Sequence, residues 1–111
     1  MATRVGVELD FDLDPTIEVD PATRETVLRI VREAVSNAGR HGHAARISVQ
    51  LTNGRGIRLL VKDDGQGFDP VGQIDTGFGL VGMQERASAL GGKFRLASHP
   101  GGGTEIEVVL P

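Results

Sequence analysis

The sequence contains no cysteine, tryptophan or tyrosine, and its only aromatic residues are four phenylalanines. The lack of cysteine excludes disulfide bonds and thiolate metal sites. Four phenylalanines are too few for the rows of aromatic rings on which single-stranded nucleic acids stack. The basic residues are not clustered, and the formal net charge is −3. A basic stripe is therefore missing as well, and we expect no nucleic-acid partner.

Long apolar runs are also missing from the sequence. No stretch reaches the roughly 18 apolar residues that a membrane-spanning helix needs. The N-terminus alternates apolar and acidic residues and does not have the pattern of a signal peptide. We therefore expect a cytoplasmic domain without membrane contact, although a full-length protein that contains it can be membrane-anchored. The length of 111 residues predicts a single domain, which comprises residues 1–111.

Glycine, by contrast, is abundant, with 16 residues concentrated between Gly54 and Gly103. Glycine gives the backbone freedom and removes side-chain bulk. A concentration of glycines in one half of the chain suggests loops built around a ligand.

Apolar periodicity predicts five strands and two helices. Residues alternate with period two over 5–13, 47–51, 94–96 and 106–110. Asn53-Gly54 predicts a hairpin turn, and the apolar run 57–61 after it predicts the buried return strand. Helical spacing extends over about 21–41, with Asp20 as the N-cap, and again over 80–90. Most strands have one polar face. We therefore predict an α+β fold, a two-layer α/β sandwich whose mixed, mostly antiparallel sheet is covered on one face by helices.

Polar side chains gather on one flank of the first predicted helix. Glu33, Asn37, Arg40 and His41 fall together there when each residue is turned by about 100°. Carboxylate and amide oxygens are ligands that Mg²⁺ prefers, and arginine binds phosphate oxygens with two parallel hydrogen bonds. A metal–phosphate site is one interpretation. An ordinary solvated flank with a hydrogen-bonded ladder from Glu33 through Asn37 to Arg40 is the other.

The stretch "KDDGQGF" places Asp63 at the end of an apolar strand, followed by Gly65 and Gly67. Asp63 could be a hydrogen-bond acceptor, a metal ligand or a solvated turn residue. Further along, "GFGLVGM" is a G-x-G-x-x-G at the start of a helix. Free N–H groups at a helix start bind phosphate. A dinucleotide fold would need a strand directly before this motif and a parallel strand after its helix, so we reject that fold. Two interpretations of the motif remain: a phosphate-binding helix start, and a glycine-rich entry to the helix without a ligand.

The order of these motifs resembles a known family. Glu33-x-x-x-Asn37-x-x-Arg40-His41, Asp63-x-Gly65-x-Gly67, Gly77-x-Gly79-Leu80-x-Gly82-Met83 and Gly101-x-Gly103-Thr104 follow one another as in the ATP-binding catalytic domain of bacterial sensor histidine kinases. That domain has the Bergerat fold of the superfamily that includes DNA gyrase, a heat-shock chaperone and a mismatch-repair ATPase. "REAVSNAGRH" and "GLVGMQERASALGG" resemble the subfamily that partners NarL-type response regulators.

The resemblance implies Mg-ATP as the ligand and a role for each matching residue. It implies that Asp63 accepts a hydrogen bond from the adenine amino group, that Thr104 supports the adenine through a water, and that residues 68–78 form a lid. The implied catalytic pair is Glu33 and Asn37, with Asn37 on Mg²⁺ and Glu33 assisting it. The implied ATP-binding residues are Asn37, Arg40, His41, Asp63, Gly65, Gly67, Gly77, Gly79, Leu80, Val81, Gly82 and Thr104.

The resemblance also implies partners. The γ-phosphoryl would pass to a histidine on a separate dimerisation domain of the same kinase and then to a NarL-type response regulator. None of the histidines of this chain is followed by an acid, as the phosphoacceptor typically is, so the isolated domain is not expected to phosphorylate itself. Its first helix uses its apolar stripe on the sheet and has no second apolar face for a dimerising bundle, so the domain is expected to be monomeric. An anti-sigma-factor serine kinase of the same fold and a non-catalytic nucleotide-binding module are the alternatives. Three residues depart from the family pattern: Asp64 replaces a frequent Asn, and Gly39 and Gly42 replace helix formers.

Overall fold

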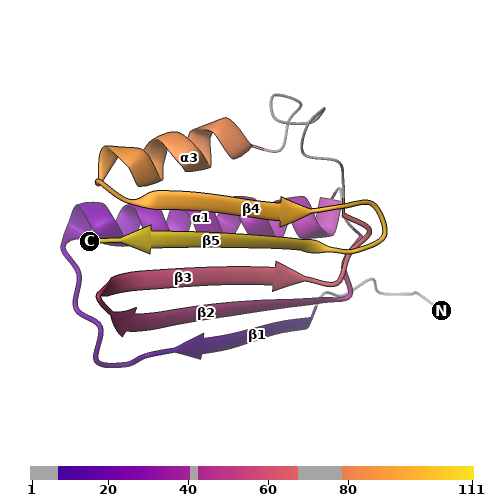
Figure 1. Cartoon of the computed structure of the whole chain (residues 1–111). Coiled ribbons are helices and arrows are strands. Elements are labelled where there is room, and N and C mark those ends of the chain that lie inside the picture. The colour runs from indigo at the N-terminus through magenta and orange to yellow at the C-terminus, as the bar shows by residue number, and fades with distance from the viewer. Residues whose placement is uncertain (1–7, 41–42, 68–78) are drawn as a thin grey trace.

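The computed structural model describes residues 8–40, 43–67 and 79–111, which form a sheet covered on one face by two helices (Figure 1). The predicted α+β sandwich is confirmed. The elements are β1 (Glu8–Leu13), α1 (Pro21–Arg40), β2 (Arg46–Gly54), β3 (Gly56–Asp63), α3 (Leu80–Ala89), β4 (Lys93–Ser98) and β5 (Thr104–Leu110). Residues 5–7 of the first predicted strand, His41 and Gly42 lie outside the described residues.

The sheet is mixed and mostly antiparallel, as the sequence predicts. Its strand order is β1-β2-β3-β5-β4, and β1 runs parallel to β2 while the other neighbours are antiparallel. The prediction of a turn at Asn53-Gly54 was wrong in position. Both residues belong to β2, and Gly54 pairs with Gly56, so Arg55 stands at the tip of the hairpin. Gly56 has a φ of 119°, which a residue with a side chain rarely adopts.

The core lies between the sheet and the helices. Its fully buried side chains come from both helices and from the inner sheet face: Ile30, Ile47, Leu59, Leu80, Met83, Val108 and Leu110. Asp20 caps the start of α1, as predicted, because its Oδ1 accepts the N–H of Thr23 at 2.7 Å. This hydrogen bond lowers the pKa of Asp20. In the described part of the chain neither helix combines the length and apolar character needed to cross a membrane.

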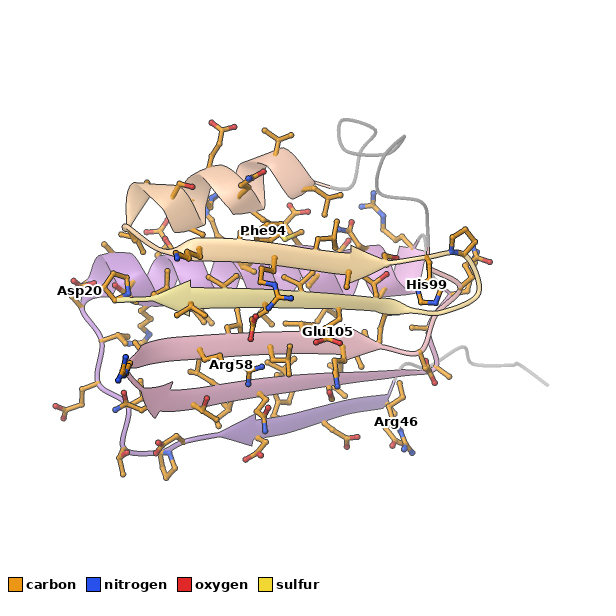
Figure 2. The ribbon with its side chains drawn as sticks, viewed as in Figure 1. Asp20, Arg46, Arg58, Phe94, His99 and Glu105 are labelled. Carbon is orange, nitrogen blue, oxygen red and sulfur yellow. The ribbon has the colours of Figure 1, made fainter. Side chains whose placement is uncertain are left out.

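The other face of the sheet is exposed and carries rows of charged side chains (Figure 2). Glu107 on β5 pairs with Arg58 on β3 and, at 3.2 Å, with Arg95 on β4. Arg46 on β2 pairs with Glu8 on β1 at 2.8 Å. Exposed ion pairs of this kind contribute at most about 1 kcal/mol each, so burial of the opposite face remains the main stabilising contribution.

Candidate nucleotide site

The sequence motifs singled out above meet at one end of the sandwich. β3 ends there at Asp63, β5 begins at Thr104, α1 ends at Arg40 and α3 begins at Leu80 (Figure 1). These segments are far apart in the sequence, and the antiparallel return of β5 beside β3 brings two of them into register. His41, Gly77 and the proposed lid, residues 68–78, lie outside the described residues, so their predicted roles are untested.

Asp63 is a half-buried acceptor whose position the backbone fixes. Its Oδ1 accepts the N–H of Gly65 at 2.8 Å, and it also receives a hydrogen bond from the backbone of Thr104. Burial nevertheless raises the pKa of Asp63, with a small contribution from the neighbouring charge of Asp64. Of the three interpretations that the sequence left open, a positioned hydrogen-bond acceptor agrees best with this environment.

The glycine loop after Asp63 packs directly on the β4–β5 turn. Gly67 has a φ of 65°, and a Cβ added to it would collide with the carbonyl oxygen of His99 and stand 2.8 Å from that of Gly103. Gly103 has a φ of 74°, and a Cβ there would collide with the carbonyl oxygen of Asp63. Glycine is therefore required at both positions. The sequence of the β4–β5 turn alone predicted only a hairpin, whereas the structure shows that it supports the loop of Asp63.

Thr104 is oriented by a residue that the sequence analysis did not identify, Ser98. The Ser98 hydroxyl donates to the carbonyl oxygen of Gly103 at 3.0 Å and lies 2.9 Å from the Thr104 hydroxyl. A serine hydroxyl has one hydrogen, so Thr104 is the donor in the second contact. The lone pairs of the Thr104 oxygen then remain to accept a hydrogen bond from a ligand or a water.

Glu33, Asn37 and Arg40 line the side of α1 next to the start of α3. Glu33 and Arg40 are exposed, and Asn37 is half-buried. In the described part of the chain neither Glu33 nor Arg40 takes part in an ion pair. Glu33 lies against Gly79, because a Cβ on residue 79 would stand 2.7 Å from its Oε2. The acid and the glycine motif, predicted separately, are thus in contact.

No side chain of the described residues caps the start of α3. Gly79 is the N-cap in the left-handed region, with φ 69°, and the first helical hydrogen bond runs from the N–H of Met83 to the Gly79 carbonyl at 3.0 Å. The N–H groups of Leu80, Val81 and Gly82 consequently have no partner within the helix. The side chain of Leu80 is buried in the core and anchors this end. An uncapped helix start with free N–H groups and a positive dipole end attracts anions.

Asp64 has a role that the sequence did not suggest. Its Oδ1 accepts the N–H groups of both Ala45 and Arg46 at 2.9 Å, and its own N–H donates to the Arg46 carbonyl at 3.2 Å. The hydrogen bond from the Arg46 backbone is the main reason that the pKa of Asp64 is lowered. The carboxylate of Asp64 is turned toward the start of β2, and it ties the segment after α1 to the loop after β3.

The residues present fit a magnesium nucleotide. A half-buried carboxylate can accept from a base, the row of free N–H groups at the start of α3 can receive phosphate oxygens, and the Asn37 amide oxygen and the Glu33 carboxylate are ligands of the kind that Mg²⁺ prefers. In the described part of the chain no group of three or more histidine, aspartate or glutamate residues forms a metal site of its own. Mg²⁺ in proteins is usually held by one or two protein ligands together with phosphate oxygens of the substrate.

Comparison with protein families matches residues 22–111 to the family described as histidine kinase-, DNA gyrase B- and HSP90-like ATPases. Among curated proteins, the sensor protein VraS of Staphylococcus epidermidis is 37% identical over 95 residues, which are 85% of this chain and 27% of that protein. VraS of Staphylococcus saprophyticus is 35% identical over 109 residues, 97% of this chain and 31% of the relative. The chain thus spans about a third or less of the length of these relatives.

Solved structures agree with the fold. The blue-light activated histidine kinase EL346 of Erythrobacter litoralis superposes with a TM-score of 0.80 at 20% identity, over 95% of this chain and 35% of that one. The ATP-binding domain of PrrB from Mycobacterium tuberculosis superposes with a TM-score of 0.64 at 26% identity, over 93% of this chain and 79% of that one.

Proposed function

The chain belongs to the family of histidine kinase-, DNA gyrase B- and HSP90-like ATPases, and from this premise we propose that it is the ATP-binding catalytic domain of a two-component sensor histidine kinase, comprising residues 1–111. The observation that carries the proposal is the convergence, at one end of the sandwich, of the Asp63 carboxylate, the free N–H groups at the start of α3 and the Glu33–Asn37 side of α1. The similarity to sensor proteins among curated relatives supports the kinase assignment.

Adenine recognition falls to Asp63. Its carboxylate, held by backbone hydrogen bonds, would accept from the amino group of adenine. Guanine has a carbonyl oxygen at that place, and two acceptors facing each other in a half-buried site repel. Gly65 and Gly67 keep the loop free of side chains beside the base, and the Thr104 hydroxyl would accept a hydrogen bond from a bridging water.

Phosphate binding falls to the start of α3 and to the side of α1. The N–H groups of Gly79, Leu80, Val81 and Gly82 would donate to phosphate oxygens, with Arg40 as a positively charged partner. When bound, Mg²⁺ neutralises charge on the phosphate oxygens. Asn37 would hold it through its amide oxygen, and Glu33 would orient a water on the metal side. His41 and Gly77 are part of the same proposal through the sequence motifs alone.

The proposal includes two partners beyond this chain. The γ-phosphoryl would pass to a histidine on the dimerisation domain of the same kinase, and from there to a response regulator, which we propose to be of the NarL type. The domain itself works in the cytoplasm, as a monomer when isolated. Its share in catalysis is to position the nucleotide and to stabilise charge, because phosphoryl transfer requires little covalent chemistry from the protein.

The test is incubation of the 111-residue chain with γ-labelled Mg-ATP, alone and with the separately purified His-containing dimerisation domain. We expect no label on the chain alone and, on the added domain, label that is stable to alkali and labile to acid. Acid-stable label would point to a serine kinase of the same fold. Nucleotide binding without any phosphoryl transfer would mean that the chain is a non-catalytic nucleotide-binding module. Absence of nucleotide binding would overturn the whole assignment.

A further inference from the structure

Among the residues that the structure describes, no helix lies over one corner of the inner sheet face. Leu9, Phe11 and Leu13 on β1 pair with Ile47, Val49 and Leu51 on β2, so their side chains point to the face that the helices cover. Nevertheless they are 42%, 55% and 51% exposed, whereas Ile47 and Val49 are buried. The reason is the position of α1, which packs over β2 and β3 and does not extend over the edge strand β1.

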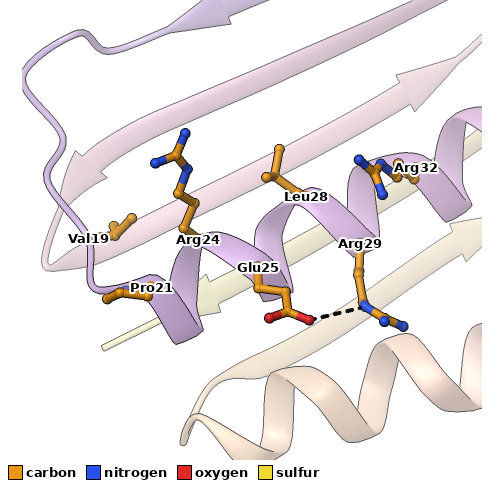
Figure 3. A pocket seen from close by; sticks show the side chains of 7 residues that line it. All are labelled: Val19, Pro21, Arg24, Glu25, Leu28, Arg29 and Arg32. Carbon is orange, nitrogen blue, oxygen red and sulfur yellow. Dashed lines mark ion pairs between the residues drawn. The ribbon is translucent and has the colours of Figure 1, made fainter.

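The flank of α1 that borders this corner combines an apolar residue with two unpaired cations. Figure 3 shows Arg24, Leu28 and Arg32 projecting on the side of α1 that faces β1. Leu28 is 48% exposed, and neither arginine forms an ion pair with any residue that the structure describes. Glu25 and Arg29, one position further along from Arg24 and Leu28, point toward α3 and pair with each other at 3.6 Å.

The spacing of these three residues suits another helix. Arg24 and Arg32 are eight positions apart, so they stand about 12 Å apart along the axis, with Leu28 midway between them. A hollow of about 380 Å³ lies along α1, lined by Arg24, Leu28 and Arg32 together with Glu25 and Arg29, and by Val19 and Pro21 at the start of the helix. Large apolar side chains exposed next to one another, with polar residues at the rim, mark interaction surfaces.

We propose that this surface, made of Leu9, Phe11, Leu13 and Leu28 with Arg24 and Arg32 and called the β1–α1 corner below, docks an amphipathic acidic helix of the kinase's own dimerisation domain. The inference rests on the proposed function, because it takes the partner from it. The matching pattern on the partner is an acid, an apolar residue and a second acid at positions i, i+4 and i+8. The two acids would pair with Arg24 and Arg32, and the apolar residue would cover Leu28 and Phe11.

Two observations favour this occupant. First, the curated relatives extend well beyond the matched region, since that region makes up only 27% to 31% of their length, so the corner belongs to a domain that works beside other parts of a larger protein. Second, a two-fold contact with a second copy of this chain would bring the unpaired arginines of both copies into one interface. Arg24 and Arg32 project on the β1 side of α1 (Figure 3), whereas Glu33 lies against Gly79 at the start of α3, so a helix docked on the corner leaves the nucleotide site open.

The test compares the double charge reversal Arg24→Glu/Arg32→Glu with the wild-type chain. Binding of the separately purified dimerisation domain is measured by calorimetry, and phosphoryl transfer to it is measured with the domain below saturation. We expect both affinity and transfer to fall by about tenfold or more, because charge reversals at an interface remove steering and add repulsion. The affinity for Mg-ADP should stay unchanged, which confirms that the variant is folded. Arg29→Glu reverses the charge of an arginine that lines the same hollow but points toward α3 and pairs with Glu25, so it is expected to weaken binding less than the double variant does.

A second variant, Phe11→Ser, tests the apolar part of the corner by the same two measurements and is expected to weaken binding of the dimerisation domain. Wild-type affinity and transfer in both variants would overturn the proposal that the β1–α1 corner binds the dimerisation domain. So would a wild-type chain that dimerises through this surface, shown by sedimentation that changes in the charge-reversal variant. If the wild-type chain binds the dimerisation domain but transfers no phosphoryl group, the proposed function fails. The affinities of the variants still show in that case whether the β1–α1 corner is the binding surface.

Discussion

The carboxylate of Glu33 lies against the main chain of Gly79, so close that a Cβ on residue 79 would stand 2.7 Å from Oε2. Through this contact the acidic side of α1 and the free N–H groups at the start of α3 hold a fixed relation to each other. The two parts proposed to act on the phosphates therefore depend on the absence of a single side chain.

Substitution of that glycine is expected to weaken nucleotide binding. In Gly79→Ala the new methyl group would displace Glu33 and would force a residue with a side chain to a φ of 69°. We expect the affinity for Mg-ADP, measured by calorimetry, to fall at least about fivefold. Gly39→Ala is the control, since no atom lies within 4 Å of its Cβ. It should bind normally and gain up to about 1 kcal/mol of stability from helix propensity. Equal affinities in the two variants would contradict the contact.

Asp63→Asn is expected to lose ATP affinity by about tenfold or more. The change replaces one acceptor oxygen by a donor that faces the amino group of adenine, and an unsatisfied buried polar group costs about 1–3 kcal/mol. Fluorescence titration with an ATP analogue measures the loss, and thermal unfolding checks the fold. A folded variant with wild-type affinity would remove Asp63 from the adenine site.

The same residue predicts a pH dependence. Burial raises the pKa of Asp63 above its ordinary value of 3.8, and only the ionised carboxylate accepts from adenine with both oxygens. Adenosine affinity should therefore decline on acidification and begin to decline at a higher pH than an ordinary aspartate would allow. Titrations between about pH 4 and pH 7 should show this slope in the wild type and not in Asp63→Asn. Parallel slopes would contradict the assignment.

The two neighbouring carboxyl groups, Asp63 and Asp64, change the stability of the fold with pH in opposite directions. A raised pKa means that the folded state holds the proton of Asp63 more tightly, so this carboxyl contributes stability at low pH that is lost as the pH rises through its folded pKa. Asp64, with a lowered pKa, contributes stability above its unfolded pKa that is lost as the pH falls through the folded one.

Variants of Asp64 can separate its charge from its hydrogen bonds. Both N–H groups that it binds go to Oδ1, and the amide oxygen of Asn can accept both as well. Asp64→Asn should therefore keep a melting temperature and Mg-ADP affinity close to the wild type, and Asp64→Ala should lower both. If the two variants melt together at a lower temperature, the carboxylate acts through its charge and not through the geometry of its oxygen.

Asn37→Ala is expected to reduce the Mg²⁺ dependence of nucleotide binding while leaving metal-free ADP nearly unaffected. The reason is that the substitution removes an oxygen ligand and leaves the adenine contacts of Asp63 in place. Calorimetry at several Mg²⁺ concentrations measures the effect. If the variant binds nucleotide with the Mg²⁺ dependence of the wild type, Asn37 is not a metal ligand and belongs to an ordinary solvated flank of α1.

The pattern of the sequence was sufficient to predict the elements but not their exact pairing. Asp20 and the apolar spacing from Val27 to Ala38 were sufficient to predict the start and the extent of α1, because a cap and an apolar stripe are local properties of the sequence. The hairpin tip was misplaced at Asn53-Gly54, since the register of β3 follows from its contacts with β5 as much as from turn chemistry.

The site was predictable where motifs carry the chemistry and unpredictable where packing does. Asp63 and the start of α3 stand out as motifs in the sequence, flanked by glycines at the end of a strand and at the start of a helix. The contact of Glu33 with Gly79, the support from Ser98 and the direction of the Asp64 carboxylate depend on neighbours that are between 5 and 46 positions away. No local pattern in the sequence contains that information.

The parallel pairing of β1 with β2 also affects the order of folding. The β2–β3 and β4–β5 pairs are hairpins between neighbouring strands, whereas β1 reaches β2 only after the whole of α1 has been laid down between them. Closing that loop costs more chain entropy than closing a hairpin. β3 and β5 also pair across a long segment, but both have neighbours on two sides, whereas β1 is an edge strand and every one of its residues remains exposed after it has paired. We therefore expect β1 to join the sheet last and to leave it first, so its amide protons should exchange well before those of β3, while the rest of the domain stays folded.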